Sequence, residues 1–343
     1  MRPSAVTELL ASTIPARLPV LLTGAPGVGK SDLVAQAAET AGADLIVSHP
    51  VVADPTDAKG LPWPAADGKS ATFLPFGDML RACHAERGTV WFLDDLGQAS
   101  PAVQASYMQL LLARRVNGHV LPDFVTFIAA TNRRTDRAGV SGILEPVKSR
   151  FASIIPVEAN LDDWTAWAID ADQPVEMVAF LRFRPELLHA FVASADLTNS
   201  PSPRTWANAG RLLALNLPPT LELAALQGAV GDGAAAEFVA FLRIYRELPN
   251  LDAILLDPDG AAIPSGPAAL YAVATGLASK ATAGNFARVA RYSERLVSAG
   301  KGEFAVLTLR DAVRRHKEVC HSPAFVKLAS GALGKLVSGG GAS

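Results

Sequence analysis

The feature that most constrains this chain is a glycine-rich turn between an apolar run and a segment with a helical pattern. The apolar run covers residues 19–22, and the helical segment covers residues 31–40. Such a turn directs backbone N–H groups at phosphate oxygens, and the N-terminus of the following helix adds partial positive charge. A lysine can reach the β- and γ-phosphates, and a hydroxyl can take one position on Mg²⁺. The pattern predicts a nucleoside triphosphate site formed by Gly24, Ala25, Pro26, Gly27, Val28, Gly29, Lys30 and Ser31.

Polar residues follow two further apolar strands. Asp94 and Asp95 end the strand expected at residues 89–93, and Asn132 follows the strand expected at residues 124–130. Ligands of α/β folds bind beyond the carboxyl ends of parallel strands, so Asn132 should lie beside the γ-phosphate. The first carboxylate, Asp94, suits Mg²⁺, and the second, Asp95, can polarise the attacking water.

The alternation of apolar strands and helices defines the predicted fold class. Strands are also expected at residues 43–48 and 152–157, so the stretch from 18 to 157 predicts a parallel sheet covered by helices on both faces. From residue 161 onward no strand pattern persists, and the sequence is rich in Ala and Leu. The chain is therefore expected to be an α/β domain followed by helices. Trp164 and Trp167 are expected to belong to a core stripe.

The stretch from 52 to 76 is rich in Pro and Gly and shows no helical or strand periodicity, except for a small hairpin expected around Gly68. Loops of this length in compact domains are usually functional or disordered. Trp63 lies between two prolines, and it is either an exposed contact residue or packed on the hairpin. A second, tight hairpin is expected at Asn117-Gly118, because this pair favours the type I′ turn.

Composition gives no sign of a strongly basic protein, a membrane-spanning protein or a disulfide-rich protein. The net charge of −2 and the pI near 6.3 provide no global basic field for nucleic acid or an anionic membrane. No apolar run is long enough to span a bilayer, and the N-terminus lacks the apolar core of a signal peptide. Cys83 and Cys320 are far apart and suggest no disulfide framework. We expect a soluble, cytoplasmic protein without a membrane segment.

The motifs in this order resemble the AAA+ ATPases, specifically the MoxR-like branch, which carries an insertion near the second helix. The resemblance implies an AAA+ core with a five-stranded parallel sheet at residues 1–158, an insertion at about 52–76, an all-α lid at 159–216, and a helical extension with a flexible tail at 217–343. The matching segments are Walker A at 24–31, Walker B at 90–95, sensor 1 at 128–133, an arginine-finger segment at 148–151, sensor 2 at 202–204, and the insertion at 54–77.

The resemblance also implies roles for single residues. Lys30 and the loop amides would hold the phosphates of ATP, and Ser31 with Asp94 would hold Mg²⁺. Asp95 would activate water, and Asn132 would orient that water or sense the γ-phosphate. Arg204 would reach the nucleotide from the lid. Arg150 would reach the nucleotide of a neighbouring subunit, which implies a homo-oligomeric ring, most often a hexamer; the rivals for this role are Arg133, Arg134 and Arg137.

For function, the resemblance implies an ATP hydrolase that remodels or activates a protein partner, often through a von Willebrand factor A-type adaptor. The helical extension would dock such a partner or enlarge the lid. The family usually has Glu where Asp95 stands, and the shorter side chain predicts slow hydrolysis. A slowly hydrolysing switch is therefore one alternative. A DNA-directed motor or loader is another, disfavoured because the insertion offers only Lys59 and Lys69 against Asp54, Asp57 and Asp67.

Overall fold

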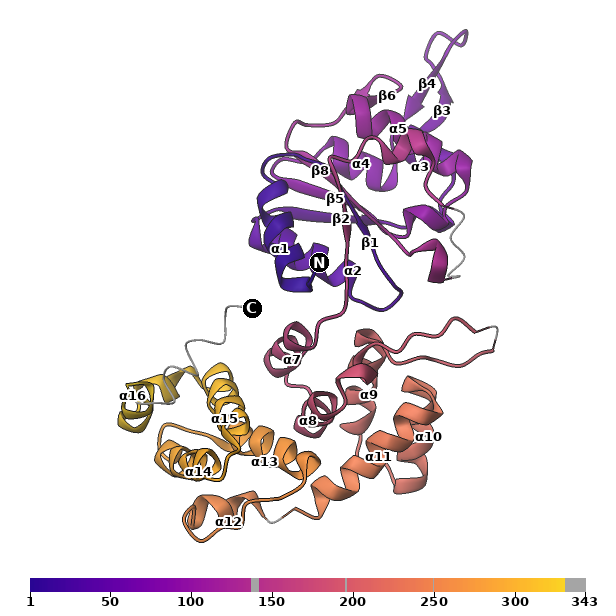
Figure 1. Cartoon of the computed structure of the whole chain (residues 1–343). Coiled ribbons are helices and arrows are strands. Elements are labelled where there is room, and N and C mark those ends of the chain that lie inside the picture. The colour runs from indigo at the N-terminus through magenta and orange to yellow at the C-terminus, as the bar shows by residue number, and fades with distance from the viewer. Residues whose placement is uncertain (137–141, 195, 249, 331–343) are drawn as a thin grey trace. The chain divides into compact units, whose positions relative to one another are not determined.

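The computed structural model describes residues 1–136, 142–194, 196–248 and 250–330. The chain forms two compact units, the first covering 1–160 with 191–196, and the second beginning at residue 161 (Figure 1). Arg137 and the predicted flexible tail lie outside the described residues.

The first unit is built on a five-stranded parallel sheet with the strand order β2-β5-β8-β1-β9. This confirms the predicted α/β class and the parallel sheet. The three middle strands are followed by the Asp94-Asp95 pair, Asn132 and the glycine-rich turn, respectively. Because these strands are adjacent and parallel, the order places the three segments side by side at the C-terminal end of the sheet. The strands are β1 (Val20–Thr23), β2 (Asp44–Ser48), β5 (Thr89–Leu93), β8 (Val125–Thr131) and β9 (Ser153–Pro156).

Two hydrophobic clusters cover the two faces of this sheet. On one face, Leu22, Phe92 and Ile128 pack with residues of α1 (Pro3–Thr13) and α2 (Lys30–Thr40). On the other, Trp91 and Phe127 stack and pack with residues of α4 (Gly77–Cys83) and α5 (Pro101–Ala113). Every residue of β5 and β8 is buried. Apolar residues on both faces explain why these strands read as continuous apolar runs.

The insertion contains a short helix and a hairpin. The helix α3 (Pro55–Lys59) was not predicted; Asp54 and Asp57 form a capping box at its start, which stabilises a turn too short for periodicity to reveal. The expected hairpin pairs β3 (Leu61–Pro64) with β4 (Ala71–Leu74) (Figure 1). The residues of both strands are exposed. Trp63 is 60% exposed, which favours the exposed alternative.

The expected second hairpin is also present. It pairs β6 (Arg115–Val116) with β7 (His119–Val120), and positive φ angles at Asn117 (50°) and Gly118 (86°) fit the type I′ turn. It is bonded to the insertion, because Asn117 Nδ2 donates to Lys59 O at 2.9 Å and His119 Nε2 lies 2.6 Å from Phe73 O. The remaining short elements of the unit are η1 (Pro50–Val52), η2 (Leu96–Gln98), η3 (Arg134–Asp136) and α6 (Glu145–Lys148).

The second unit contains no strand among its described residues. Phe180, Trp206 and Phe238 pack with ring centroids 5.0–5.6 Å apart and join three of its helices. The predicted tryptophan stripe holds only in part: Trp164 is buried, but Trp167 is 36% exposed. The elements are α7 (Leu161–Asp170), α8 (Val175–Phe183), η4 (Pro185–Leu188), α9 (Pro203–Leu213), α10 (Pro219–Val230), α11 (Asp232–Arg246), α12 (Leu251–Leu256), α13 (Pro267–Lys280), α14 (Phe286–Ser298), α15 (Gly302–Arg315), η5 (Lys317–His321) and α16 (Pro323–Ala329).

No helix in the described parts of the chain is long and apolar enough to cross a membrane.

Candidate functional site: a phosphate loop facing an acidic pair

The loop between β1 and α2 needs glycines because of its backbone conformation and its close packing. Gly27 and Gly29 have φ angles of 77° and 91°, in the left-handed region that side chains disfavour. Gly29 is the N-cap of α2, so the loop leads directly into the N-terminus of that helix. A Cβ at Gly24 would lie 2.6 Å from the carbonyl oxygen of Val157, so only glycine fits there. The loop is thus closely packed at its start and left-handed at its end.

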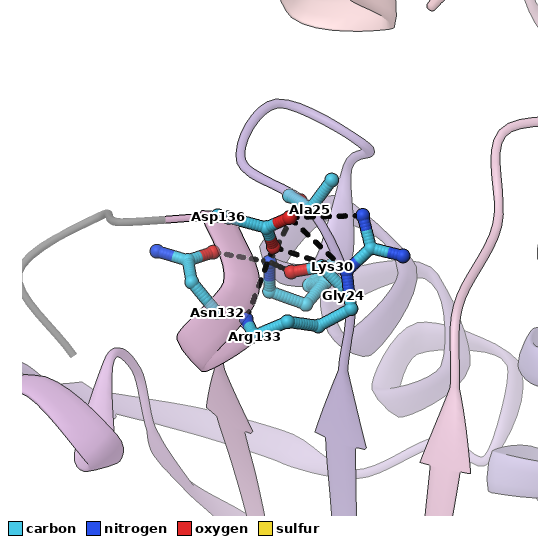
Figure 2. A network of polar contacts seen from close by, with 6 residues as sticks. All are labelled: Gly24, Ala25, Lys30, Asn132, Arg133 and Asp136. Carbon is cyan, nitrogen blue, oxygen red and sulfur yellow. Dashed lines mark hydrogen bonds and ion pairs between the residues drawn. The ribbon is translucent and has the colours of Figure 1, made fainter. Parts of the chain in front are cut away.

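Lys30 connects this loop to the end of β8. Its side chain is nearly buried, at 7% exposure. Its Nζ donates to Gly24 O at 3.0 Å, Ala25 O at 3.1 Å and Asn132 Oδ1 at 2.8 Å (Figure 2). The ammonium group is therefore held where the phosphate loop and the predicted sensor residue meet.

Ser31 connects the first turn of α2 to the end of β5. Its Oγ donates to Asp94 Oδ2 at 2.7 Å, and the backbone N–H of Asp94 donates to Ser48 O at 2.9 Å. A hydroxyl beside a carboxylate is a pair of hard oxygen donors of the kind Mg²⁺ takes together with phosphates and waters. The two residues predicted to hold the metal thus lie together and fit it.

Asp95 lies on the other side of Asn132 from Lys30. Its φ of 57° is left-handed, a region that aspartate tolerates better than most side chains. Asn132 Nδ2 is 3.5 Å from Asp95 Oδ1, at the outer limit of a hydrogen bond. Asn132 thus bridges the ammonium group and the second carboxylate. The structure brings together all the predicted residues of the phosphate loop, the acidic pair and the sensor strand.

The structure distinguishes two of the candidate arginines by what surrounds them. Arg133 donates from its backbone N–H at 3.2 Å and from its guanidinium at 3.0 Å to the buried carboxylate of Asp136 (Figure 2). These hydrogen bonds raise the pKa of Arg133 and hold its side chain on its own chain. Arg150 lies between α6 and β9, where Nη1 contacts Ser149 Oγ at 3.3 Å. Its Nε is buried without a hydrogen-bond partner among the described residues.

Asp136 was missed in the sequence. The only signal was its spacing of three residues from Arg133, which becomes meaningful once η3 brings the two side chains together. Arg204 lies in the second unit, exposed in the first turn of α9, where Ser202 and Thr205 form a capping box. Its contact with a nucleotide stays a prediction.

Comparisons with known proteins give a family match for one part of the chain. Residues 19–151 match the model of the AAA domain of the dynein-related subfamily. Among solved structures, the chain is similar to the RuvB Holliday junction branch migration motor of Thermotoga maritima, with 17% identity, 80% of each chain covered and a TM-score of 0.39. It is also similar to NtrX from Brucella abortus in complex with ATP, with 14% identity, 89% of this chain and 67% of that chain covered, and a TM-score of 0.44. The comparison with curated proteins found no match. The similarity to the AAA domain covers the phosphate loop, the acidic pair, Asn132 and Arg150.

Proposed function

We propose that this chain, whose residues 19–151 match the AAA domain, is a ring-forming AAA+ ATPase of the MoxR-like kind that hydrolyses ATP to remodel or activate a protein partner. The observation that carries the proposal is one connected set of polar contacts. Lys30 bonds to the phosphate loop and Asn132, Asn132 approaches Asp95, and Ser31 bonds to Asp94. These are the groups that phosphoryl transfer to water requires.

The residues divide the work by their chemistry. The loop amides and the Lys30 ammonium bind the phosphates, and the N-terminus of α2 adds its dipole. Ser31 and Asp94 would hold Mg²⁺, which would neutralise charge on the β- and γ-phosphates. Asp95 accepts a proton from the attacking water, or orients it, while the Asn132 amide fixes that water relative to the γ-phosphate. Arg204 is proposed to contact the same nucleotide from the helical lid.

Arg150 is proposed to complete the site of a neighbouring copy. A guanidinium is fixed in charge and planar, so it can stabilise the transferring phosphoryl group. Arg133 is a weaker candidate, because Asp136 already occupies its guanidinium. An arginine that acts on a neighbour requires a ring with a heterologous interface, and we propose a hexamer.

The insertion supports a protein rather than DNA as the partner. The hairpin exposes Trp63, Leu61 and Leu74, and exposed apolar side chains gathered on one element mark protein contacts. Backbone N–H groups of Thr56 and Lys69 lower the pKa of two acids of the insertion, Asp54 and Asp67, respectively. The whole insertion has three acids against two lysines, so it offers no net positive charge to a phosphate backbone.

A von Willebrand factor A-type adaptor is the partner we propose for the helical region 217–343. The described residues of that region are helical and end in α16. We also propose a cytoplasmic location, because Cys83 and Cys320 are both free and reduced thiols are the rule in that compartment.

A slowly hydrolysing switch is the second candidate, and one observation favours it. The 3.5 Å separation of Asp95 Oδ1 and Asn132 Nδ2 leaves the acidic side chain short of a good hydrogen bond. Both candidates share the nucleotide site and differ in turnover.

The proposal is tested by measuring ATP binding with a fluorescent analogue and hydrolysis by phosphate release. We expect Lys30→Ala to abolish both, because it removes the ammonium group that is proposed to hold the β- and γ-phosphates. Lys69→Ala removes an exposed lysine of the hairpin and serves as the matched control, with both activities intact. Unaltered binding in Lys30→Ala would overturn the proposed site.

A further inference from the structure

Gln104 is a buried polar residue to which the proposed mechanism assigns no role. It lies on α5 and is 1% exposed. Its Nε2 donates to Ala99 O at 3.0 Å and to Gly142 O at 2.9 Å, and its Oε1 accepts from the N–H of Leu144 at 3.0 Å. One side chain thus bonds two backbone segments that lie about forty residues apart in the sequence.

The first of these segments is the acidic turn, which we define as residues 94–99. The second is the finger segment, residues 142–150, which ends at Arg150. They are also bonded directly, because the Gly142 N–H donates to Gly97 O at 3.3 Å. A Cβ at Gly97 would lie 2.1 Å from Thr131 Oγ1 and 3.4 Å from Ile143 Cγ1. The acidic turn, the end of β8 and the finger segment therefore meet at Gly97.

Hydrogen bonds continue from Gln104 to the arginine. Leu144, whose N–H Gln104 accepts, is the N-cap of α6 and accepts the N–H groups of Val147 and Lys148 at 2.9 Å each. Val147 O in turn accepts the N–H of Arg150 at 3.1 Å. Val147 is fully buried in the same cluster as Leu96 of the acidic turn. Bonded and packed groups thus form a continuous path from the acidic turn to Arg150.

Apolar packing alone would not need a glutamine here. A buried side-chain amide that makes hydrogen bonds to both segments fixes their relative direction and register. Removing the amide would leave the buried backbone groups that it bonds without partners. We propose that Gln104 is a positioning residue that couples the acidic turn of a subunit's own nucleotide site to the Arg150 that this subunit presents to its neighbour. The inference rests on the proposed trans role of Arg150.

Mixed rings test this coupling, because they separate the copy that hydrolyses from the copy that lends the arginine. An Arg150→Ala copy keeps its own nucleotide site, and an Asp95→Asn copy keeps its Arg150. Each variant alone should be inactive. When the two are mixed in equal amounts with ATP, turnover should return at each Arg150→Ala copy whose neighbour is an Asp95→Asn copy, because that neighbour supplies Arg150.

Gln104→Met, which keeps the side-chain volume and removes the three hydrogen bonds, is then added to one copy at a time. Added to the Asp95→Asn copy, it should lower the regained turnover by about tenfold or more, since displacement of a catalytic group by about 1 Å can cost about 100-fold in rate. Added to the Arg150→Ala copy, it should leave the regained turnover unchanged, because the Asp95 end of the acidic turn keeps its own backbone bonds, from Asp94 N–H to Ser48 O and from Gln98 N–H to Asp95 O. Particle mass and ATP binding are measured for every mixture. If Gln104→Met does not assemble, Gln104→Ala replaces it, because water can enter and bond to the freed backbone groups.

The outcomes separate the possible roles. Loss only on the arginine-lending copy supports the coupling. Loss on the hydrolysing copy, equal loss on both, or no loss on either overturns it, because Gln104 would then act within its own site or on the fold alone. Failure of the parent mixture to regain any turnover would instead contradict the trans role of Arg150, and would remove this inference together with its premise.

Discussion

Replacing Asp95 with glutamate should raise the turnover of ATP. The Asp95 carboxylate stands 3.5 Å from Asn132 Nδ2, beyond the usual range of about 2.7–3.2 Å. One more methylene extends its reach by roughly 1.5 Å, the length of a C–C bond. A misplacement of about 1 Å can cost about 100-fold in rate, equivalent to about 2.7 kcal/mol of activation free energy. Asp95→Glu should therefore raise kcat by up to about 100-fold, without changing the affinity for ATP.

The same substitution should lower stability. Asp95 has a left-handed backbone, with φ at 57°, and aspartate tolerates this conformation better than a longer side chain does. Forcing glutamate into it should cost about 1 kcal/mol, which corresponds to a fall in Tm of about 2–4 °C for a unit of this size. A faster and less stable variant is the expected result.

Steady-state phosphate release against ATP concentration gives kcat and KM, and thermal denaturation gives Tm. Asp95→Asn keeps the size of the side chain and removes its charge, so it should lose turnover. A kcat for Asp95→Glu at or below that of the wild type, with normal ATP affinity, would refute the idea that the reach of the carboxylate limits hydrolysis.

Three further substitutions test other parts of the structure. Gly97→Ala should lower the free energy of unfolding by about 1–3 kcal/mol, because its Cβ would lie 2.1 Å from Thr131 Oγ1; denaturant titration measures this. Asp311→Ala should cost about 3–5 kcal/mol in the second unit, since it leaves the nearly buried Arg182 guanidinium without a counter-charge; thermal denaturation measures this. Unfolded casein, used as a model protein client, should stimulate the turnover of the wild type; Trp63→Ala should abolish this stimulation by removing an exposed apolar contact, while changing stability by less than about 0.5 kcal/mol and leaving basal turnover intact.

Matched substitutions provide the controls. Asp252→Ala breaks an exposed ion pair with Lys280 and should cost no more than about 1 kcal/mol, so an equal loss in Asp311→Ala would contradict the importance of burial. Trp167→Ala removes a half-exposed tryptophan of the second unit and should leave stimulation by casein unchanged. Unchanged stability in Gly97→Ala would show that the acidic turn and β8 are less closely packed than argued above.

The sequence predicted the parts of the fold that local patterns specify. The strand expected at residues 89–93 is β5 (Thr89–Leu93) itself, and the Asn117-Gly118 turn has the predicted hairpin. Both depend on runs of apolar residues or on the φ preferences of one or two residues. The glycine-rich loop at residues 24–31 was predictable for the same reason. Its pattern lies within eight residues and reflects the backbone conformations that only glycine readily adopts.

Contacts between distant segments were beyond such patterns. Gln104 looks like an ordinary polar residue of a helix, and its burial depends on residues 142–144 passing beside α5. The pairing of Arg133 with Asp136 depends on a turn that has no periodicity. Trp167 was assigned to the core by its spacing from Trp164, yet helical spacing alone does not give the width of the buried face. Gln104, Arg133 and Asp136 hold segments of the candidate site together, and only the folded chain reveals their contacts.

The most direct test of the account measures ATP turnover and particle mass in the presence of ATP for the wild type and Arg150→Ala, with Arg81→Ala, an exposed arginine of α4, as the control. We expect a ring in all three proteins, normal ATP binding, and turnover reduced by about 1000-fold or more in Arg150→Ala alone. A wild type that stays monomeric with ATP, together with unchanged turnover in Arg150→Ala, would contradict the trans arginine and the ring.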